Sequence, residues 1–450
     1  MTDSLLYSEL VSEVFDNHSN VYISGVGGTG KSFQLKLLYQ EAVKRGIKCV
    51  LLSTTGVSSF NIGGRTVHSW SGIVFPSYSL DLEENQERFI ASIDKKTSLP
   101  PYKDRYTDVE IVFIDEVSML GALYFETLDY IARKRRGTKV GSKLVDSPLS
   151  FGGIQLVLTG DMAQLPPVKD GFIFESEVWD DLKLKDFVLM KAYRFDSQEW
   201  TDLLARARLG ELTQKDKNIL KSRLGEASSK CIKFMPLNRD ADRLNKKCLD
   251  AVEGSATILT AGDSVEVVKG KNRIVKKTIA PIPHEFDKIF IVDGELHLKV
   301  SARVMLRFNL NVEEGLTNGS LGVIKNIDLD EQIIYVKFDD NSEVVPIEPI
   351  EFVDEDYDAD GSILIRTRVQ YPLSLAYATS IHKSQSLTFN EIEIDIGSNI
   401  FCPGQSYVAL SRCRSLSGLR LTIFNSNKVY ADPKAIAFEK ELNKRATKIY

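Results

Sequence analysis

The chain has 450 residues, and its composition is that of a folded protein. Because compact domains usually hold about 100–200 residues, this length predicts two to four domains. The hydrophobic fraction of 43% and the charged fraction of 26% exclude a globally disordered chain. The net charge of −5 argues against a protein that coats its whole surface with nucleic acid, but it leaves room for one basic groove.

The cysteine spacing and the hydropathy pattern bear on the cellular compartment. No two cysteines form a C-x-x-C pair, so a zinc site or a disulfide framework is not expected. The N-terminal stretch lacks a basic segment followed by a long apolar run, and no stretch approaches the ~18–20 apolar residues of a membrane helix. These features predict a soluble, intracellular protein without membrane partners, in the nucleus, the cytoplasm or a viral or phage replication site.

The first third of the chain alternates short apolar strands with helical patterns. We expect a helix over 31–45 and strands over 21–24, 49–52, 111–114 and 154–158. This alternation predicts a parallel, doubly wound sheet, in which the polar residues after the strands meet in one crevice. Residues 74–107, rich in proline and charge, indicate a small inserted subdomain, and residues 137–150 indicate an exposed loop.

A second α/β pattern begins with a strand over 231–235 and a helix over 240–252. From about 312 to 372, short strands separated by turns predict a small β-barrel inserted in this second α/β domain. The acidic run 351–360 indicates a solvated hairpin tip, with an electrostatic gate as the alternative.

Residues 25–32 match the phosphate-binding pattern G-x-x-x-x-G-K-S at every fixed position, between a strand and a helix. Glycines allow backbone N–H groups to turn inward around phosphates, and the helix N-terminus adds a favourable dipole. Lys31 is expected to reach the β- and γ-phosphates of ATP, and the Ser32 hydroxyl to ligate Mg²⁺. The alternative is a glycine turn without a ligand. The residues expected to bind nucleotide are Gly25, Val26, Gly27, Gly28, Thr29, Gly30, Lys31 and Ser32.

Five further residues predict nucleotide hydrolysis. Asp115 and Glu116 follow an apolar strand, where the first would hold Mg²⁺ and the second would deprotonate the attacking water. The alternative is an acidic pair that merely ends a strand. Gln164 could sense the γ-phosphate, because its amide both donates and accepts hydrogen bonds. Arg194 and Arg412 are candidates for an arginine finger, which can contribute ~10³–10⁵ in rate, although either alone would more often form a surface ion pair.

Taken together, these stretches resemble the petite-integration-frequency family of superfamily 1B DNA helicases, relatives of RecD. The resemblance runs from about residue 20 to about residue 425. It implies an α/β fold with two RecA-like P-loop domains, over 1–190 and 191–450, with the small insertion near 74–107 in the first and an SH3-like β insertion near 312–372 in the second. The matching blocks are 55–73, 114–119, 131–133, 151–161, 318–320, 375–385 and 404–412.

The resemblance also implies an activity and assigns roles. It implies an ATP-dependent 5′-to-3′ DNA helicase or translocase, a monomeric motor that steps along single-stranded DNA and unwinds forked or tailed duplex. One wall of an interdomain ATP cleft would carry Lys31, Ser32, Asp115, Glu116 and Gln164, and the other wall Arg194 and Arg412. DNA would be gripped without base reading by Thr55, His68, Ser69, Thr379, His382 and Lys383.

Several departures and alternatives stay open. Ser8 stands where the family has an adenine-reading glutamine, which puts the preference for ATP over other nucleotides in question. Phe195 replaces a usual glutamine, and Ser386 replaces a usual glycine near the DNA. The alternative function is a DNA-stimulated ATPase that remodels or anneals DNA without processive unwinding. The basic run 133–136 could be a nuclear localisation signal, but a structural or DNA-facing role is favoured.

Overall fold

The computed structural model describes residues 2–73, 75, 83–225, 231–269, 273–279, 286–287, 289–311, 313–357 and 362–449. Parts of the regions predicted at 74–107, 312–372 and 351–360 therefore lie outside the described residues. The chain divides into two compact units. The first comprises Met1–Arg194, Asp356–Ser362 and Asp432–Tyr450, and the second comprises Phe195–Glu355 and Ile363–Ala431.

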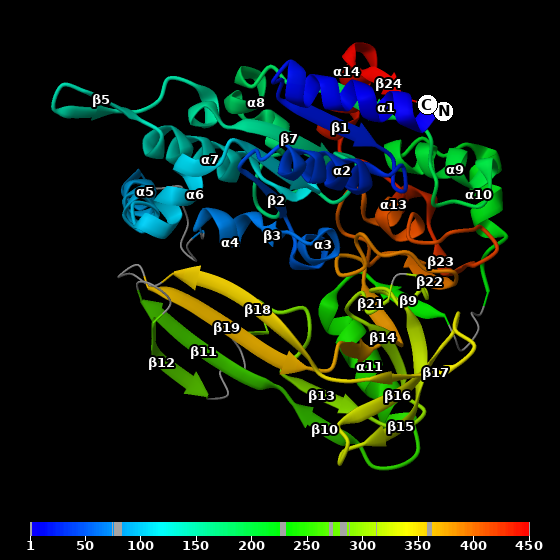
Figure 1. The fold of residues 1–450 in the computed structure, drawn as a ribbon. Helices are drawn as coiled ribbons and strands as arrows, with labels where there is room; N and C mark the ends of the chain where they lie inside the picture. Colours follow the sequence, from blue (N-terminus) through cyan, green and yellow to red (C-terminus); the bar gives the residue numbers. More distant parts are fainter. Residues whose placement is uncertain are drawn as a thin grey trace. The chain divides into compact units, whose positions relative to one another are not determined.

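A seven-stranded parallel sheet forms the centre of the first unit (Figure 1). Its strands, in spatial order, are β24 (Thr447–Ile449), β8 (Lys185–Leu189), β1 (Val21–Gly25), β7 (Gln155–Gly160), β4 (Ile111–Asp115), β2 (Cys49–Ser53) and β3 (Arg65–Thr66). Strands β1 and β4 are buried at every residue, as is typical of a parallel sheet covered on both faces. The predicted α/β fold is confirmed, and the predicted strands of this unit match β1, β2, β4 and β7 to within two residues at each end.

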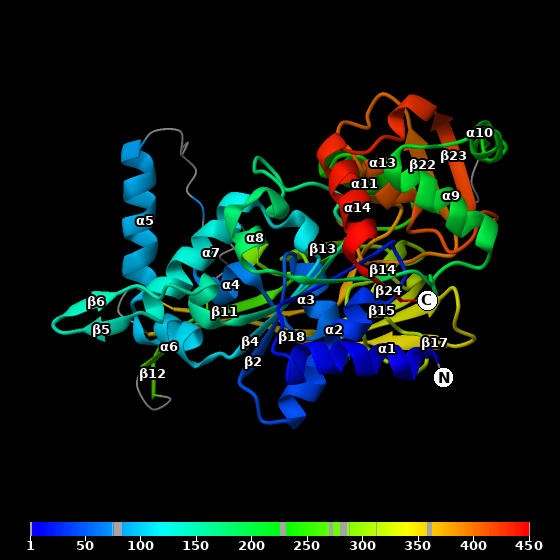
Figure 2. The same ribbon diagram turned by 90° about the horizontal axis from the view of Figure 1, so that it is seen from above.

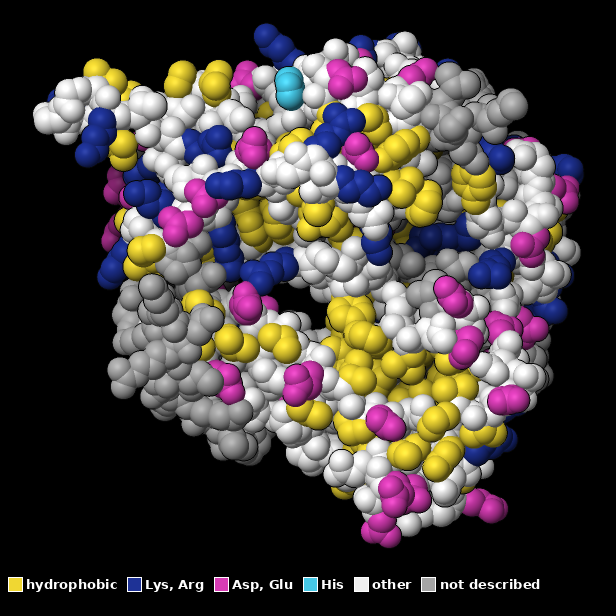
Figure 3. Space-filling model, viewed as in Figure 1, with side chains coloured by type: hydrophobic (Ala, Val, Ile, Leu, Met, Phe, Trp, Pro, Cys, Tyr) yellow, Lys and Arg dark blue, Asp and Glu magenta, His cyan; other side chains and the backbone are white. Residues whose placement is uncertain are grey.

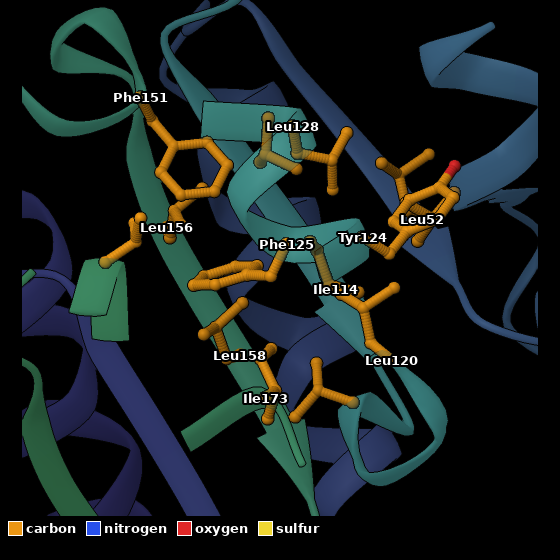
Figure 4. Packing of buried hydrophobic residues seen from close by; sticks show 14 of the residues in the cluster. Leu52, Ile114, Leu120, Tyr124, Phe125, Leu128, Phe151, Leu156, Leu158 and Ile173 are labelled. Carbon is orange, nitrogen blue, oxygen red and sulfur yellow. The ribbon is translucent and has the colours of Figure 1, made fainter. Parts of the chain in front are cut away.

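Helices cover both faces of this sheet. On one face, Phe125 and Leu128 pack against Leu156 and Leu158 of β7 (Figure 4). On the other face, Leu35 packs into a second apolar cluster. Each large side chain buried in this way contributes about 1.5–3 kcal/mol of hydrophobic stabilisation. The helices of this unit are α1 (Thr2–Val11), α2 (Lys31–Lys44), α3 (Gly56–Ile62), α4 (Val67–Ser71), α5 (Glu83–Thr97), α6 (Pro100–Asp108), α7 (Ala122–Arg135), α8 (Glu177–Asp181) and α14 (Pro433–Arg445).

The end of the chain belongs to the first unit, which corrects the predicted assignment of residues 432–450 to the second domain. Strand β24 pairs in parallel with β8, and Thr447 lies opposite Phe187. The Arg445 side chain in α14 forms an ion pair with Asp186 at 2.6 Å. The sequence could not show this, because a three-residue edge strand has no periodic signal of its own.

The basic run at the end of α7 serves the fold. Arg133 forms an ion pair with Asp129 at 2.6 Å, and Lys134 forms one with Asp94 of α5 at 2.9 Å. The Arg136 guanidinium donates hydrogen bonds to four backbone carbonyls. These contacts support the structural interpretation of the run over a localisation signal. Beyond it, the predicted loop at 137–150 contains an antiparallel hairpin of β5 (Thr138–Val140) and β6 (Lys143–Val145).

The second unit also contains a parallel sheet, which has four strands. Its spatial order is β21 (Ala378–Ser380), β9 (Ile232–Met235), β22 (Ile392–Ile396) and β23 (Leu419–Phe424). The helices of this unit include α9 (Gln198–Leu209), α10 (Gln214–Lys221), α11 (Asn238–Ala251) and α13 (Gln405–Leu410). The predicted strand at 231–235 and helix at 240–252 correspond to β9 and α11.

Antiparallel strands occupy much more of the second unit than the predicted insertion at 312–372. They begin at β10 (Thr257–Thr260), which pairs with β13 (Glu295–Leu298). A four-stranded sheet has the order β12 (Arg273–Ile279), β11 (Gly262–Lys269), β19 (Ile363–Gln370) and β18 (Ile350–Tyr357). A five-stranded sheet has the order β17 (Val344–Ile347), β16 (Ile333–Phe338), β15 (Leu321–Asp328), β14 (Arg303–Leu306) and β20 (Leu373–Leu375). The antiparallel region therefore starts more than fifty residues before the predicted boundary at 312, and the SH3-like insertion at 312–372 stays a prediction.

None of the helices in the described part of the chain combines the length and the hydropathy that crossing a membrane requires.

Candidate nucleotide and DNA sites

The phosphate-binding loop joins β1 to α2 in the first unit. Gly28 (φ 83°) and Gly30 (φ 88°) adopt left-handed backbone conformations, which favour glycine. Gly30 caps α2 without a side chain, so the first N–H groups of the helix face the loop. The Lys31 ammonium donates to the carbonyls of Gly25 at 2.7 Å and Val26 at 3.2 Å. These bonds fold the lysine over the loop, where a phosphate would displace them.

Arg194 lies against this loop, which corrects its predicted place on the opposite wall beside Arg412. The Tyr193 N–H donates to the Gly28 carbonyl at 2.8 Å. A Cβ added to Gly28 would come within 2.4 Å of the Arg194 Cβ. Both residues belong to the first unit. Glycine is therefore required at position 28 for two reasons, its backbone conformation and the close approach of Arg194.

Asp115 ends β4 as a fully buried carboxylate. Its Oδ1 accepts hydrogen bonds from the Thr159 hydroxyl at 2.5 Å and from the Glu116 N–H at 3.0 Å. Burial raises the pKa of Asp115, and the neighbouring Glu116 carboxylate raises it further. The hydroxyls of Thr159 and Ser32 and the ammonium of Lys31 act in the opposite direction, which places the loop beside the carboxylate.

These residues fit a Mg²⁺ ion. The Asp115 Oδ2 is buried and has no hydrogen-bond partner among the described residues. The Ser32 hydroxyl lies beside this carboxylate, and both are the hard oxygen ligands that Mg²⁺ prefers. The described residues contain no cluster of three or more His, Cys, Asp or Glu side chains that could hold a metal. Nucleotide phosphate and water would supply the other ligands of such an ion.

Glu116 has a left-handed backbone (φ 56°, ψ 42°), which is uncommon outside glycine. Its carbonyl accepts a hydrogen bond from the Thr54 hydroxyl at 2.9 Å, and its side chain is buried. The Glu116 carboxylate thus stays close enough to Asp115 to raise its pKa.

Gln164 is buried, and its amide nitrogen donates to Asp161 Oδ2 at 3.2 Å. Asp161 is fully buried and also accepts the Ala163 N–H at 3.2 Å. Asp161 and Thr159 belong to the matching block 151–161, and the sequence pattern assigned neither of them a role. Their position is the signal that could have identified them, because the end of a parallel strand and the residue after it are where such sheets place ligand-binding side chains.

Arg412 belongs to the second unit, where it is buried beside its own helix α13. Its Nε donates to the Val408 carbonyl at 3.1 Å, and its Nη2 donates to the Ser411 hydroxyl at 2.8 Å. A further Nη1 bond reaches the Leu387 carbonyl at 3.4 Å. These bonds hold the guanidinium in a fixed orientation.

The DNA candidates of the first unit lie in the segments that follow β2 and β3. The Thr55 hydroxyl caps α3 by accepting the Ser58 N–H at 3.1 Å. His68 is exposed on α4, and its ring centroid lies 4.6 Å from that of Tyr124. Ser69 is partly buried on the same helix. A polar surface formed by short helices suits contact with phosphate and sugar.

The DNA candidates of the second unit lie on β21 and the segment after it. Thr379 is only 6% exposed, whereas Lys383 is exposed. The His382 ring stacks on Phe401 with centroids 6.2 Å apart, and burial lowers the pKa of His382. Ser386 has φ 66°, a left-handed conformation that explains why a glycine would be favoured there.

A glycine-rich phosphate loop after β1 and a buried acidic pair after β4 of a parallel sheet define a P-loop nucleoside triphosphatase. Residues 3–230 match the family model described as PIF1-like helicase, and residues 286–327 match the model of the DNA helicase Pif1 2B domain. The chain therefore belongs to the PIF1-like helicase family.

Proteins that are similar to this chain over most of its length are named as Pif1 helicases. The chain is 34% identical over 437 residues to the ATP-dependent DNA helicase PIF1 of Danio rerio, covering 94% of this chain and 62% of that protein. It is 29% identical over 430 residues to the Pif1 helicase of Bdellovibrio bacteriovorus, covering 94% of this chain and 88% of that protein. The chain thus spans about three fifths of the length of the vertebrate relatives that it matches.

Solved structures show the same fold. Bacteroides Pif1 in complex with ADP-AlF4 has a TM-score of 0.76 at 26% identity, covering 97% of this chain and 96% of that one. Pif1 helicase from Candida albicans has a TM-score of 0.73 at 27% identity, covering 97% and 98%.

Proposed function

We propose that this protein is an ATP-dependent DNA helicase that moves 5′ to 3′ along single-stranded DNA. One observation carries the proposal. The phosphate loop, with Lys31 and Ser32, lies beside the buried carboxylate of Asp115, and Glu116 follows in a fixed left-handed conformation. A second carboxylate next to the residue that would bind magnesium can accept a proton from the attacking water, as hydrolysis requires. The helicases of this family that the chain resembles support coupling of hydrolysis to DNA.

The proposed chemistry assigns one task to each residue. The N–H groups of the loop and of the first turn of α2 bind the phosphates of ATP, and Lys31 moves from the Gly25 and Val26 carbonyls to the β- and γ-phosphates. Ser32 and Asp115 would hold Mg²⁺, and the ion would supply positive charge beside the phosphates of ATP. Glu116 orients the attacking water and takes its proton.

Three more residues complete the proposal. Gln164, fixed by Asp161, orients the water or the γ-phosphate. Arg194 and Arg412 neutralise charge on the γ-phosphate as arginine fingers. Arg194 is held against the loop, whereas Arg412 belongs to the second unit.

The proposed track is single-stranded DNA, with forked or tailed duplex as the substrate and a single chain as the motor. Thr55, His68 and Ser69 form one grip, and the second-unit residues Thr379, His382 and Lys383 form the other. Support comes from Bacteroides Pif1, which is 26% identical and has been solved bound to single-stranded DNA. A second Pif1 structure at 26% identity concerns DNA unwinding at forked duplex DNA by two coordinating Pif1 helicases. Such a motor would be nearly sequence-blind and strongly salt-dependent.

The first test asks whether ATP hydrolysis depends on DNA, as a motor requires, and on the residues assigned above. ATP hydrolysis by the wild-type protein should rise steeply on addition of single-stranded DNA and vanish in Lys31→Ala. Glu116→Gln should bind ATP and DNA but not hydrolyse, because the amide cannot accept the proton. Hydrolysis that ignores DNA would refute the motor, and normal turnover by Glu116→Gln would refute the assignment of the base.

The second test concerns direction. A duplex with a 5′ single-stranded tail should be unwound, whereas the same duplex with only a 3′ tail should not. Unwinding from the 3′ tail alone would overturn the proposed polarity. Annealing or remodelling without unwinding of either substrate would overturn the helicase proposal.

A further inference from the structure

The β5–β6 hairpin of the first unit carries apolar side chains that the described residues leave exposed. All of its strand residues are exposed. Val140 is 65% exposed, Leu144 59% and Val145 47%. The hairpin extends beyond the rest of the first unit in both ribbon views (Figures 1 and 2), and in this region the surface shows hydrophobic and basic side chains together (Figure 3). Exposed apolar groups on a projecting element indicate a binding surface.

Both faces of the hairpin combine a lysine with an apolar side chain. A two-residue turn at Gly141 and Ser142 joins the strands, and Val140 lies opposite Lys143, whereas Lys139 lies opposite Leu144. Residues directly opposite in an antiparallel pair share a face, and successive residues alternate between faces. The ribbon can therefore present charge and apolar surface together to a ligand that lies along either face.

The hairpin is anchored at its base. The Ser147 N–H donates to the Arg133 carbonyl at 3.0 Å, and the Arg133 guanidinium donates to the Pro148 carbonyl at 3.2 Å and to the Ser150 hydroxyl at 3.2 Å. Arg133 is itself paired with Asp129 on α7. A free two-stranded hairpin is only marginally stable in water, so this anchorage is needed to hold the ribbon in place.

The charge of the hairpin favours an anionic partner. No acidic residue occurs between positions 137 and 145. Within the described part of the chain, Lys139 and Lys143 form no ion pair, whereas Arg133 and Lys134 just before them are paired with aspartates. The two lysines are therefore available to a negatively charged ligand.

The position of the hairpin favours DNA over a protein. The end of α7 is tied to α5 through the ion pair of Lys134 with Asp94. Helix α5 belongs to the insertion that follows α4, which carries the proposed DNA contacts His68 and Ser69. In both ribbon views, β5, β6 and α5 lie on the same side of the first unit (Figures 1 and 2). A duplex that continues from the gripped strand on this side would meet the hairpin.

We propose that the β5–β6 hairpin binds the duplex arm of a tailed DNA substrate. A two-stranded β-ribbon fits the major groove, which is about 12 Å wide. The face that enters the groove carries one lysine and one apolar side chain, either Lys143 with Val140 or Lys139 with Leu144. Its lysine contacts phosphate, and its apolar side chain packs against base edges and thymine methyl groups. The inference rests on the proposed function, because it requires that the protein engage a strand next to a duplex.

The test compares two DNA probes that share one strand. Equilibrium binding is measured by fluorescence anisotropy for a 5′-tailed duplex and for its tailed strand alone, over a range of salt concentrations. The charge variant is K139A/K143A and the apolar variant is V140S/L144S. The matched control is K36A/K44A, which removes the same charge from exposed positions on α2. Single-stranded DNA-stimulated ATP hydrolysis checks that each variant is folded.

Each variant has a distinct expected result. K139A/K143A should bind the tailed duplex about tenfold more weakly and lower its salt-dependence slope by about one, because the phosphate contact is lost whichever face enters the groove. V140S/L144S should bind the tailed duplex more weakly, but the salt dependence of binding should keep its slope, because apolar contacts release no counterions. Neither variant should change binding of the single strand, and K36A/K44A should match the wild type on both probes.

Two results would overturn the inference while the proposed function stands. One is wild-type binding of the tailed duplex by both variants, the result expected if the hairpin serves an acidic protein partner. The other is equal weakening on both probes. If the wild-type protein neither binds single-stranded DNA nor hydrolyses ATP in response to it, the proposed function itself fails.

Discussion

At the scale of single residues, the candidate site combines groups that destabilise the fold with groups that hold them in place. Asp115 is a buried carboxylate whose Oδ2 lacks a partner among the described residues, and Glu116 has a strained backbone conformation. Each costs about 1–3 kcal/mol in isolation. Thr159 and Thr54, from the neighbouring strands β7 and the end of β2, supply compensating hydrogen bonds. Such a balance is expected where a site is built for a ligand rather than for stability.

Thr159 should act on magnesium through Asp115. Thr159→Val keeps the shape of the side chain but removes the hydrogen bond to Asp115 Oδ1, so that the carboxylate is oriented less tightly, with the Glu116 N–H still bound at 3.0 Å. Loss of a partner that orients a metal ligand typically lowers metal affinity by about 10–100-fold. The Mg²⁺ concentration that gives half-maximal ATP hydrolysis should rise by that factor, and Thr159→Ser should restore it. An unchanged Mg²⁺ titration for Thr159→Val would contradict the role.

Asp115→Asn should stabilise the nucleotide-free protein while abolishing hydrolysis. Because burial raises the pKa of Asp115 in the folded state, the folded protein holds its proton more tightly than the unfolded chain does. The stability that this provides is lost as pH rises through the folded pKa, so at neutral pH the ionised carboxylate is a net cost. The neutral amide of asparagine avoids the cost of burying a charge, and its oxygen can still accept a hydrogen bond from the Thr159 hydroxyl. We expect a gain of about 1–3 kcal/mol in the free energy of unfolding. A lower melting temperature for the variant would contradict this account.

At the scale of elements, hydrophobic patterns in the sequence predicted those strands and loops whose formation depends on nearby residues. The phosphate loop, β1, β4 and β7 follow from continuous apolar runs that end in glycine or acid, and all lie where the sequence placed them. The hairpin within 137–150 was not predicted from the sequence, because its exposed strands have no alternation of apolar and polar residues. The place of Arg194 did not follow either. It depends on a backbone bond between Tyr193 and Gly28, residues that are remote in sequence.

The long strands β11 and β19 are joined by a buried guanidinium, which predicts a large stability effect. Arg368 is fully buried on β19, forms a two-pronged ion pair with Asp263 of β11 at 2.8 Å, and bonds Asp287 at 2.6 Å. Arg368→Ala leaves Asp263 buried and unpaired, which should cost about 3–5 kcal/mol of unfolding free energy in denaturant titration. The double variant Arg368→Ala with Asp263→Ala removes both charges, so it should lose less unfolding free energy than Arg368→Ala alone. A double variant at least as unstable as the single one would show that packing, not charge, holds the strands together.

At the scale of the whole molecule, the two units are not two consecutive stretches of chain. The segment Asp432–Tyr450 returns to the first unit after the second is complete. Periodicity and motif spacing predict which segments fold together locally, so they assigned this segment to its neighbours in sequence. The true assignment depends on side chains that meet across more than 250 residues, such as the stacked rings of Phe438 and Phe174, whose centroids are 4.3 Å apart.

This return predicts that the C-terminal segment supports nucleotide binding without touching nucleotide. Leu442 is fully buried, and the Phe438 ring packs edge-on against Trp179 and Tyr22, which is in the strand that leads into the phosphate loop. Leu442→Ala should cost about 2–5 kcal/mol of stability in the first unit. A chain ending at residue 431 should lose more, because β24 is also removed. In thermal melting, the transition that ATP analogues shift should fall in temperature, while any transition of the second unit should stay. The exposed neighbour Lys444→Ala is the matched control, because its ion-pair partner Glu441 lies on the same helix. If the chain ending at 431 melts and binds ATP analogues like the full chain, the segment is an accessory of the first unit and not part of its fold.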